Sequence, residues 1–253
     1  MKRVNASDTE AGRLKSKLSD QNLIKLKIDG AEVSVPEGTM ILKAAKDVGI
    51  MIPTMCQVEG LTPYGGCRLC LVEVNGTPKL FPACTTPVGE NMEISTNTER
   101  LKEYRKMAVQ QLLAERTHIC SVCTANDHCE LQAMANQLGV DHVMYERKFT
   151  KKEIDSTHDF LVIDRNRCIL CTRCIRVCDE IEGVHTLDLK LRGKDSEVIM
   201  DLDEKWADSC SCTSCRKCAK VCPVGAIYIE DEPISKTKNK GIVEFIQTRR
   251  RRK

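Results

Sequence analysis

The sequence has few aromatic residues and no long apolar run. Only 4% of its 253 residues are Phe, Trp or Tyr, which is little for a chain that builds its core from side chains. No apolar segment approaches the roughly 18 residues of a membrane-spanning helix. The segment from Met1 to Glu10 lacks the apolar stretch of a secretory signal. We therefore expect a cytoplasmic protein without a transmembrane segment.

Several motifs of nucleotide and metal catalysis are also missing. No Gly-x-Gly-x-x-Gly follows a predicted strand, and there is no Walker loop. No nickel-binding cysteine pair lies outside the cysteine motifs described below. We therefore expect no catalytic residue and no NAD or flavin site on this chain itself.

Cysteine, in contrast, is abundant. The chain has 16 cysteines, about 6% of its residues, with 42% hydrophobic and 30% charged residues, so extensive disorder is excluded. In a reducing cytosol so many cysteines favour metal binding over disulfides. A secreted protein held by disulfides is an alternative, but it would need a signal sequence.

The charge is placed unevenly. From Lys236 onward there are eight basic residues and one acid, so this segment has a net charge of +7, and the overall charge of +3 leaves −4 on the rest. A basic tail on an acidic body favours either a solvated terminus lying on a partner subunit or contact with nucleic acid. A zinc-rich nucleic-acid-binding protein is therefore a second alternative, although we expect no nucleic-acid partner.

The elements predicted from the first third of the chain describe a small α+β sheet domain. Residues 23–28 and 32–35 alternate as strands around Asp29-Gly30, a typical two-residue hairpin turn. A helix is predicted to begin with Thr39 as N-cap and to end at Gly49. Residues 71–74 predict a strand that Asn75-Gly76 closes.

Further helices and strands are predicted downstream. One helix covers about residues 98–116, with Leu101, Tyr104, Ala108 and Leu112 on its apolar face, and a shorter one covers 130–138 and ends at Gly139. Residues 160–163 and 226–229 predict strands that flank two cysteine-dense segments.

Those two segments form an internal repeat with the spacing C-x2-C-x2-C-x3-C. In two-cluster bacterial ferredoxins this run binds 4Fe–4S clusters, and its fourth cysteine completes the other cluster. Tetrahedral zinc needs two close pairs, so a third thiolate at this step does not fit it. We assign one 4Fe–4S cluster to Cys168, Cys171, Cys174 and Cys222, and a second to Cys178, Cys212, Cys215 and Cys218.

The N-terminal cysteines are spaced differently. Plant-type 2Fe–2S ferredoxins use C-x4-C-x2-C and a distant fourth cysteine. This chain has the same closely spaced central pair, but the gap between its first two cysteines is longer. Zinc is the alternative metal for this site. We assign a 2Fe–2S cluster to Cys56, Cys67, Cys70 and Cys84.

The middle cysteines offer only three thiolates, whereas a 4Fe–4S cluster takes four ligands. Cys120, Cys123 and Cys129 need one more, and neutral imidazole is a competent iron ligand. His118 lies two residues before Cys120 and is preferred to His128. Cys210 is then left as a spare thiol.

These motifs together resemble a known family. The residues that carry the likeness are Pro53-Thr54-Met55-Cys56, Gly66-Cys67-Arg68-Leu69-Cys70, Cys120-Ser121-Val122-Cys123 with Cys129-Glu130-Leu131-Gln132, Arg167-Cys168-Ile169-Leu170-Cys171-Thr172-Arg173-Cys174 and Cys222-Pro223-Val224-Gly225-Ala226. The sequence resembles the diaphorase iron–sulfur (U, or gamma) subunit of bidirectional NAD-linked nickel–iron hydrogenases. It is also similar to the N-terminal part of the complex I large iron–sulfur subunit and to the accessory domain of iron-only hydrogenases.

The resemblance implies an α+β chain of successive iron–sulfur domains. They would be a lead-in at 1–22, a β-grasp 2Fe–2S domain at 23–98, a small helical 4Fe–4S domain with one histidine and three cysteine ligands at 99–146, a two-cluster bacterial-ferredoxin-like domain at 147–232 and a basic tail at 233–253. The complex I pattern has its ligand histidine four residues before the first middle cysteine. Here that position is Arg116, so His118 must serve.

The resemblance also implies a function. The chain would be the electron-transfer subunit of an NAD(P)-linked oxidoreductase, with one 2Fe–2S and three 4Fe–4S clusters and no turnover alone. Its partners would be a flavin-containing, NAD(P)H-oxidising iron–sulfur subunit and the small and large subunits of a nickel–iron hydrogenase, or another catalytic module. The same subunit in an NAD-dependent formate dehydrogenase, an electron-bifurcating complex or a complex I-like assembly is the alternative.

Overall fold

The computed structural model describes residues 22–147 and 151–237. The predicted lead-in (1–22) lies outside the described residues up to residue 21, and the predicted basic tail (233–253) does so from residue 238 on. The described residues form two compact units. Unit 1 comprises residues 22–52 and 70–98, and unit 2 comprises 53–69 and 99–237 without the gap at 148–150.

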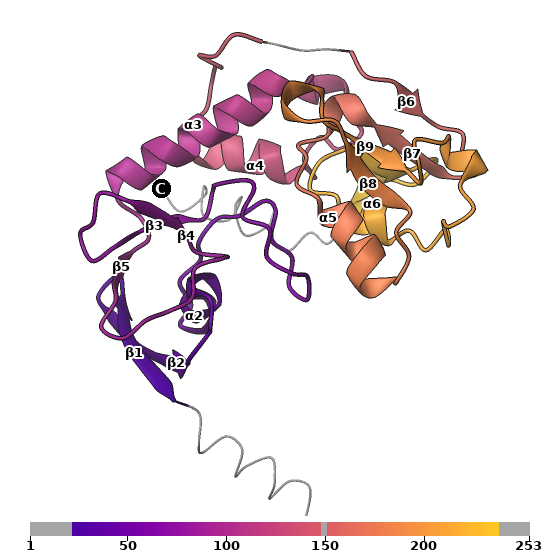
Figure 1. The fold of residues 1–253 in the computed structure, drawn as a ribbon. Coiled ribbons are helices and arrows are strands. Elements are labelled where there is room, and N and C mark those ends of the chain that lie inside the picture. The colour runs from indigo at the N-terminus through magenta and orange to yellow at the C-terminus, as the bar shows by residue number, and fades with distance from the viewer. Residues whose placement is uncertain (1–21, 148–150, 238–253) are drawn as a thin grey trace, which may run out of the picture. The chain divides into compact units, whose positions relative to one another are not determined.

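Unit 1 is a mixed sheet with one crossing helix (Figure 1). Its strands follow the order β2-β1-β5-β3-β4, in which β1 and β5 are parallel and the other neighbours antiparallel. The elements are β1 (Leu23–Ile28), β2 (Ala31–Pro36), α2 (Ile41–Asp47), β3 (Leu71–Val74), β4 (Leu80–Pro82) and β5 (Glu93–Ser95). The predicted order of hairpin, helix and second hairpin is confirmed.

The first hairpin forms as its sequence predicts. Ile24, Leu26 and Ile28 are buried on one face of β1 while the residues between them are exposed. Asp29 and Gly30 have φ values of 47° and 83°, the positive pair that a two-residue hairpin turn requires. This turn therefore sets the register between β1 and β2.

The start of α2 differs from the prediction. The N-cap is Met40, not Thr39, and no side chain caps the helix. The Thr39 hydroxyl instead donates to the Pro36 carbonyl at 2.6 Å. The predicted end is confirmed, because Gly49 has a φ of 78° and Ile50 N–H donates to the Ala45 carbonyl, as in a Schellman motif.

Gly49→Ala is expected to destabilise the protein by about 1–2 kcal/mol, because a left-handed conformation is strained for residues with a Cβ. No heavy atom lies within 4 Å of a Cβ built there, so the loss is conformational rather than steric. Gly49→Asn should lose less, since Asn tolerates this region. Chemical unfolding measures both, and equal stability of the alanine variant and the wild type would contradict the assignment.

Unit 2 contains the remaining elements. Its helices are α3 (Glu99–Glu115), α4 (Glu130–Gln137), α5 (Arg173–Arg176), α6 (Lys217–Val221) and α7 (Ile234–Thr237), and its strands are β6 (Ile154–Asp155), β7 (Leu161–Asp164), β8 (Leu187–Lys190), β9 (Glu197–Met200) and β10 (Ile227–Ile229). A π-helical turn, Val177–Ile181, continues α5. The long α3 packs beside α4, and the short α5 beside α6 (Figure 1).

The buried face of α3 agrees with the prediction only in part. Leu101 is buried, but Tyr104 is 38% exposed, and Ala108 and Leu112 only flank the core. The core face instead includes Arg105, which donates to the Leu69 carbonyl at 3.0 Å. A buried arginine with its own partner is invisible to apolar periodicity, which is why the prediction failed here.

The strands that flank the two cysteine runs pair with each other. β10 and β7 are antiparallel, with Tyr228 opposite Val162, and β6 lies on the other side of β7. The hairpin of β8 and β9 was not predicted. Buried apolar residues of α4, β7 and β10 and several cysteines share one core, so the cysteine loops are packed among side chains.

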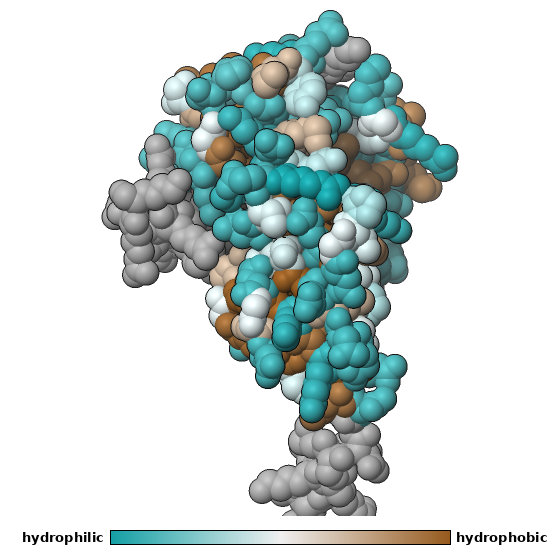
Figure 2. Space-filling view, turned by 90° about the vertical axis from the view of Figure 1, so that its left-hand side faces the viewer, coloured by the Kyte–Doolittle hydropathy of each residue, from teal (hydrophilic) through white to brown (hydrophobic). Residues whose placement is uncertain are grey.

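The face shown in Figure 2 is mostly hydrophilic, and the hydrophobic residues on it form only smaller patches among the hydrophilic ones. Within the part of the chain that the structure describes, α3 is the longest helix at 17 residues. None of the helices there combines the length and apolar character needed to cross a membrane.

Candidate metal centres

All sixteen cysteines lie in the described residues, and all are thiols there rather than disulfides. A protein held by disulfides is thus not what the structure shows. No group of three or more His, Cys, Asp or Glu side chains in the described ranges is arranged to hold a single metal ion. The thiols instead lie around hollows and in close pairs, which we take in chain order.

The N-terminal cysteines form a pair in each unit. In unit 1 the sulfurs of Cys70 and Cys84 are buried and 3.4 Å apart. In unit 2 a hydrogen bond with Cys56 and burial hold the pKa of the Cys67 thiol far above its usual range. The backbone N–H of Met55 also donates to Cys67 Sγ at 3.4 Å. One site made by all four thiols stays a prediction.

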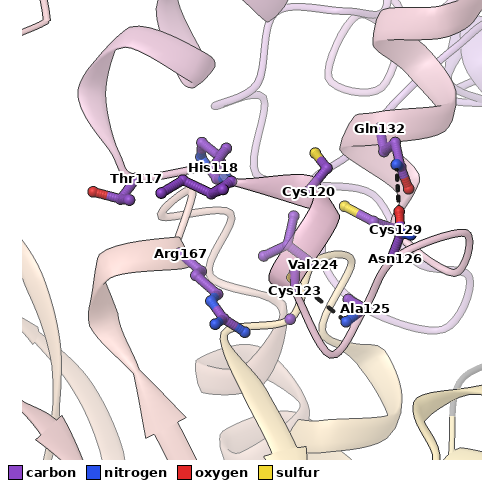
Figure 3. A pocket seen from close by; sticks show the side chains of 12 residues that line it. Thr117, His118, Cys120, Cys123, Ala125, Asn126, Cys129, Gln132, Arg167 and Val224 are labelled. Atoms are coloured by element: carbon purple, nitrogen blue, oxygen red, sulfur yellow. Dashed lines mark hydrogen bonds between the residues drawn. The ribbon is translucent and has the colours of Figure 1, made fainter.

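The middle cysteines surround one hollow together with the predicted histidine. It is lined by Cys120, Cys123, Cys129 and His118 and has a volume of about 330 Å³, including the part open to solvent. Figure 3 shows these side chains with Arg167 around the hollow, and the Ala125 N–H donating to Cys123 Sγ at 3.4 Å. His128 is not among the residues that line it.

His118 has the chemical properties that a metal ligand requires. Its Nε2 is buried and has no hydrogen-bond partner among the described residues. The imidazole also hydrogen-bonds to the Leu112 backbone, which leaves Nε2 as the lone-pair nitrogen. Burial, with the charges of Arg116, Arg147 and Arg167, lowers the pKa of His118 to about 4, so the ring is neutral at pH 7. Metal binding requires this neutral form.

Arg116, at the position of the complex I ligand, has a different role. It is buried, and its guanidinium donates to the carbonyls of Cys168, Lys194 and Ser196 at 3.2, 3.2 and 2.8 Å. These bonds tie the chain after α3 to the first cysteine run and to the segment before β9. The arginine is thus a structural link between two loops of unit 2.

A second hollow in unit 2 brings together four thiols of the repeat. Cys178, Cys212, Cys215 and Cys218 all line it, with a volume of about 340 Å³ including its open part. Cys178 comes from the first run and the other three from the second. Burial raises the pKa of Cys218 far above its usual range, and the charges of Cys215, Cys212 and Cys178 add to the effect.

The remaining four cysteines of the repeat also act on one another. Desolvation raises the pKa of Cys168 to about 11 and of Cys171 to about 12, and in both cases the charge of Cys222 adds to the shift. Burial raises the pKa of Cys174 well above its usual value, with contributions from Cys171, Cys168 and Cys222 and, last, from Cys218 of the second run. Thiolates that repel one another in a desolvated loop need a cation nearby, which a metal cluster provides.

The backbone of the two runs repeats as closely as their sequence. Leu170 and Ser214 occupy equivalent positions and have φ values of 52° and 54°. Thr172 and Arg216, also equivalent, have φ values of 58° and 64°. The left-handed conformation is strained for such residues, above all for β-branched Thr172, and strain of this kind gathers at functional sites. In the first run this conformation accompanies a backbone N–H that faces sulfur, because Leu170 N–H donates to Cys168 Sγ at 3.4 Å.

Trp206 contributes a side-chain donor to the second run. It is 1% exposed, lines the second hollow, and its indole Nε1–H donates to Cys212 Sγ at 3.4 Å. The indole ring also meets His158 edge-on at 5.5 Å between centroids. The residue is therefore packed, and it also touches a candidate ligand. Its position six residues before Cys212 is the only signal in the sequence.

A buried ion pair connects the middle cysteines with the first run. Glu130 follows Cys129 at the start of α4, and Arg173 lies between Cys171 and Cys174. Both Arg173 Nη atoms donate to the Glu130 carboxylate at 2.8 Å, and Nη1 also reaches the Val221 carbonyl at 3.4 Å. The two opposite charges compensate each other, while the buried Arg173 Nε has no hydrogen-bond partner among the described residues. The sequence gives no sign that these two residues meet.

A close backbone approach occurs at the same place. A Cβ on Gly225 would lie 2.9 Å from the Ala125 Cβ and 3.3 Å from Cys123 Sγ, so a larger residue would push the middle loop away. The loop after Cys222 therefore packs directly on the middle hollow, which Val224 and Gly225 help to line. Cys210, the unassigned cysteine, is exposed and lines neither hollow.

Three family models match successive parts of the chain. Residues 21–99 match a 2Fe–2S iron–sulfur cluster binding domain, residues 105–144 the NADH-ubiquinone oxidoreductase-G iron–sulfur binding region, and residues 158–228 the ferredoxin-like domain of NADH-quinone oxidoreductase subunit 3. The presence of 2Fe–2S and 4Fe–4S domains, predicted from cysteine spacing, is confirmed at this level.

Relatives that match most of the chain are also subunits of NAD(P)-linked oxidoreductases by name. The chain is 34% identical over 238 residues to the NADP-reducing hydrogenase subunit HndD of Solidesulfovibrio fructosivorans, covering 90% of this chain and 40% of that protein. It is 36% identical over 208 residues to an NADH-quinone oxidoreductase subunit of Rhizobium meliloti (strain 1021), covering 81% and 24%. The chain thus spans less than half the length of these relatives.

A solved structure is similar over most of both chains. It belongs to an NAD+-reducing [NiFe]-hydrogenase in the H2-reduced state, with a TM-score of 0.77 and 29% identity over 83% of this chain and 88% of that one. The family resemblance inferred from the motifs is therefore confirmed.

Proposed function

We propose that this chain, a homologue of the iron–sulfur subunits of NAD(P)-linked hydrogenases and NADH-quinone oxidoreductases, carries single electrons between a flavin subunit that oxidises NAD(P)H and a nickel–iron hydrogenase module. The observation that carries the proposal is the sorting of cysteines. The middle three and a neutral histidine line one hollow, and Cys178, Cys212, Cys215 and Cys218, the set proposed for one 4Fe–4S cluster, line another. The cytoplasm is the expected compartment.

The proposed cofactors are one 2Fe–2S and three 4Fe–4S clusters. The ligand sets are Cys56, Cys67, Cys70 and Cys84 for the 2Fe–2S cluster, and His118, Cys120, Cys123 and Cys129, then Cys168, Cys171, Cys174 and Cys222, then Cys178, Cys212, Cys215 and Cys218 for the 4Fe–4S clusters. The domain ranges 23–98, 99–146 and 147–232 remain predictions with them. The mixed sheet of unit 1 supports a β-grasp fold for the first range.

When bound, the clusters supply one-electron redox chemistry, and the protein sets their environment. His118, which lines the middle hollow, has a neutral ring with a buried Nε2 that could bind iron, and a hydrogen bond with the Leu112 backbone fixes its ring. Backbone and indole N–H groups aim at ligand sulfurs and favour the more negative, reduced state. Arg173 and Glu130 hold the middle and first-run loops together.

Co-purification tests the proposal. The chain is tagged in its native host and isolated without oxygen, and the metals and flavin of the complex are measured. A flavin and nickel are the expected result. The likeness to NADH-quinone oxidoreductase subunits favours a complex I-like assembly as second candidate. Quinone-reducing partners without nickel would support that candidate, and molybdenum or tungsten would indicate a formate dehydrogenase.

Trp206→Phe is expected to lower the midpoint potential of one 4Fe–4S cluster. The change keeps an aromatic ring but removes the N–H that donates to Cys212 Sγ, and hydrogen bonds to sulfur raise cluster potentials. A redox titration followed by EPR measures the shift. The other clusters serve as internal controls, and a shift of all of them would point to general unfolding.

A further inference from the structure

The first cysteine run carries two arginines where the second carries lysines. Arg173 and Arg176 align with Lys217 and Lys220 in the repeat. Arg173 binds Glu130 beside the middle cysteines, while Lys217 binds Glu182 nearby in the ferredoxin-like part. The difference at the second position is larger, because Lys220 is exposed and Arg176 is half-buried in contact with another loop.

Arg176 reaches the loop that carries Cys56. Its Nη1 donates to the Thr62 carbonyl at 2.6 Å, and its Nη2 donates to the Cys56 carbonyl at 2.5 Å. The same Nη2 donates to the Cys171 carbonyl at 3.3 Å. The guanidinium also lies over the Tyr64 ring, 5.8 Å from its centroid. One nitrogen atom therefore joins the backbones of two cysteines that we assign to different clusters.

A second charged side chain of the same segment fixes the same loop. Glu180, in the π-helical turn that follows α5, accepts the Thr62 N–H at 2.7 Å. Thr62 is thus held at both its N–H and its carbonyl by residues four apart. The planar fork of arginine makes several directed bonds at once, which the single ammonium of a lysine at this position does not reproduce.

We infer that Arg176 is a positioning residue for electron transfer between the N-terminal 2Fe–2S cluster and the 4Fe–4S cluster of the first run. The inference rests on the proposed function. One electron leaves the first cluster and enters the second, so the first is oxidised and the second reduced by one electron, and no bond or proton moves. Arg176 holds Cys56 against Cys171 so that this step is short.

The test uses the full chain loaded with clusters, in its native complex where that is available. The variants are Arg176→Lys, Arg176→Met and, as matched control, Lys220→Met at the equivalent position. A photochemical pulse reduces the chain, and rapid-freeze EPR follows electron equilibration between the 2Fe–2S and 4Fe–4S signals. Magnetic coupling between the two reduced clusters is a second readout that does not depend on turnover.

The expected result is slower equilibration and weaker magnetic coupling in both Arg176 variants, with unchanged iron content. A small displacement of reacting centres is costly, so we expect a fall of about tenfold or more in rate. Lys220→Met should behave as the wild type. It removes a positive charge at the position of the second run that is equivalent to Arg176, but it breaks no contact between loops among the described residues.

Wild-type equilibration and coupling in Arg176→Lys and Arg176→Met would overturn the inference. If Arg176→Met loses iron, the test uses Arg176→Lys and Glu180→Gln, which change the contacts to the Cys56 loop less severely. Equilibration rate and magnetic coupling are measured for these two variants in the same way. Failure of the proposed function looks different, since it shows in the co-purified partners or in a wild-type chain that lacks one of the two EPR signals, and not in a difference between the Arg176 variants and the wild type. The two failures are therefore distinguishable.

Discussion

Replacing His118 with alanine is expected to remove one 4Fe–4S cluster, lowering the iron content from about fourteen to about ten atoms per chain. The imidazole is the fourth ligand in the proposed set, and its buried Nε2 has no other partner among the described residues. Iron analysis and EPR under anaerobic conditions measure the loss. One 4Fe–4S signal should vanish while the 2Fe–2S signal and the other two 4Fe–4S signals remain.

His128→Ala is the matched control, because His128 lies in the same cysteine segment but does not line the hollow. It should keep all the iron. Four persisting signals in His118→Ala would show that water or another side chain completes the cluster, and loss of iron in His128→Ala would reverse the assignment. His118→Cys tests the site further, since a thiolate ligand should restore the cluster at a lower potential.

Replacing Glu130 with alanine is expected to destabilise the cluster-loaded protein by about 3–5 kcal/mol, because it leaves a buried arginine charge uncompensated. Glu130 and Arg173 are 8% and 4% exposed, and both Nη atoms bond to the carboxylate at 2.8 Å. The pair also connects loops that carry the proposed ligands of two clusters. Anaerobic denaturant unfolding, with cluster absorbance as a second probe, measures the effect.

Two companion variants separate the ion pair from other causes. Glu99→Ala breaks an exposed pair with Lys102 in α3, and pairs of that kind contribute little to stability, so the loss should be small. Glu130→Leu combined with Arg173→Met removes both charges and should recover part of the stability lost by Glu130→Ala. A double variant no more stable than Glu130→Ala would place the effect outside the ion pair.

The parts of the fold that sequence predicts are those with local causes. Asp29-Gly30 and Gly49 adopt the positive φ values that their residue types favour. The N-cap of α2 was misplaced because the Thr39 hydroxyl finds the Pro36 carbonyl instead of a helix N–H. The face of α3 was misplaced because its core position is filled by Arg105, whose partner at Leu69 is distant in sequence.

In the candidate site, too, the features with local causes were predictable and those that depend on distant residues were not. Cysteine spacing predicts the ligand sets of the repeat, since three thiols at fixed steps can wrap one cluster. Four thiols of one predicted set, Cys178, Cys212, Cys215 and Cys218, line one hollow. The residues around the ligands were not predictable. Arg116, Arg173 and Arg176 all act through carbonyls or a carboxylate far away along the chain. Nothing in their local sequence distinguishes them from surface charges.

The proposed exchange of the fourth cysteines between the two runs also bears on how the protein is made. Cys222 is assigned to the set of the first run, whose thiols its charge affects, and Cys178 lines a hollow with the thiols of the second run. A ribosome that has synthesised only the first run has therefore produced neither complete ligand set. Both sets become complete only when residue 222 has emerged, so we expect these two clusters to be inserted late and together, after translation of almost the whole chain.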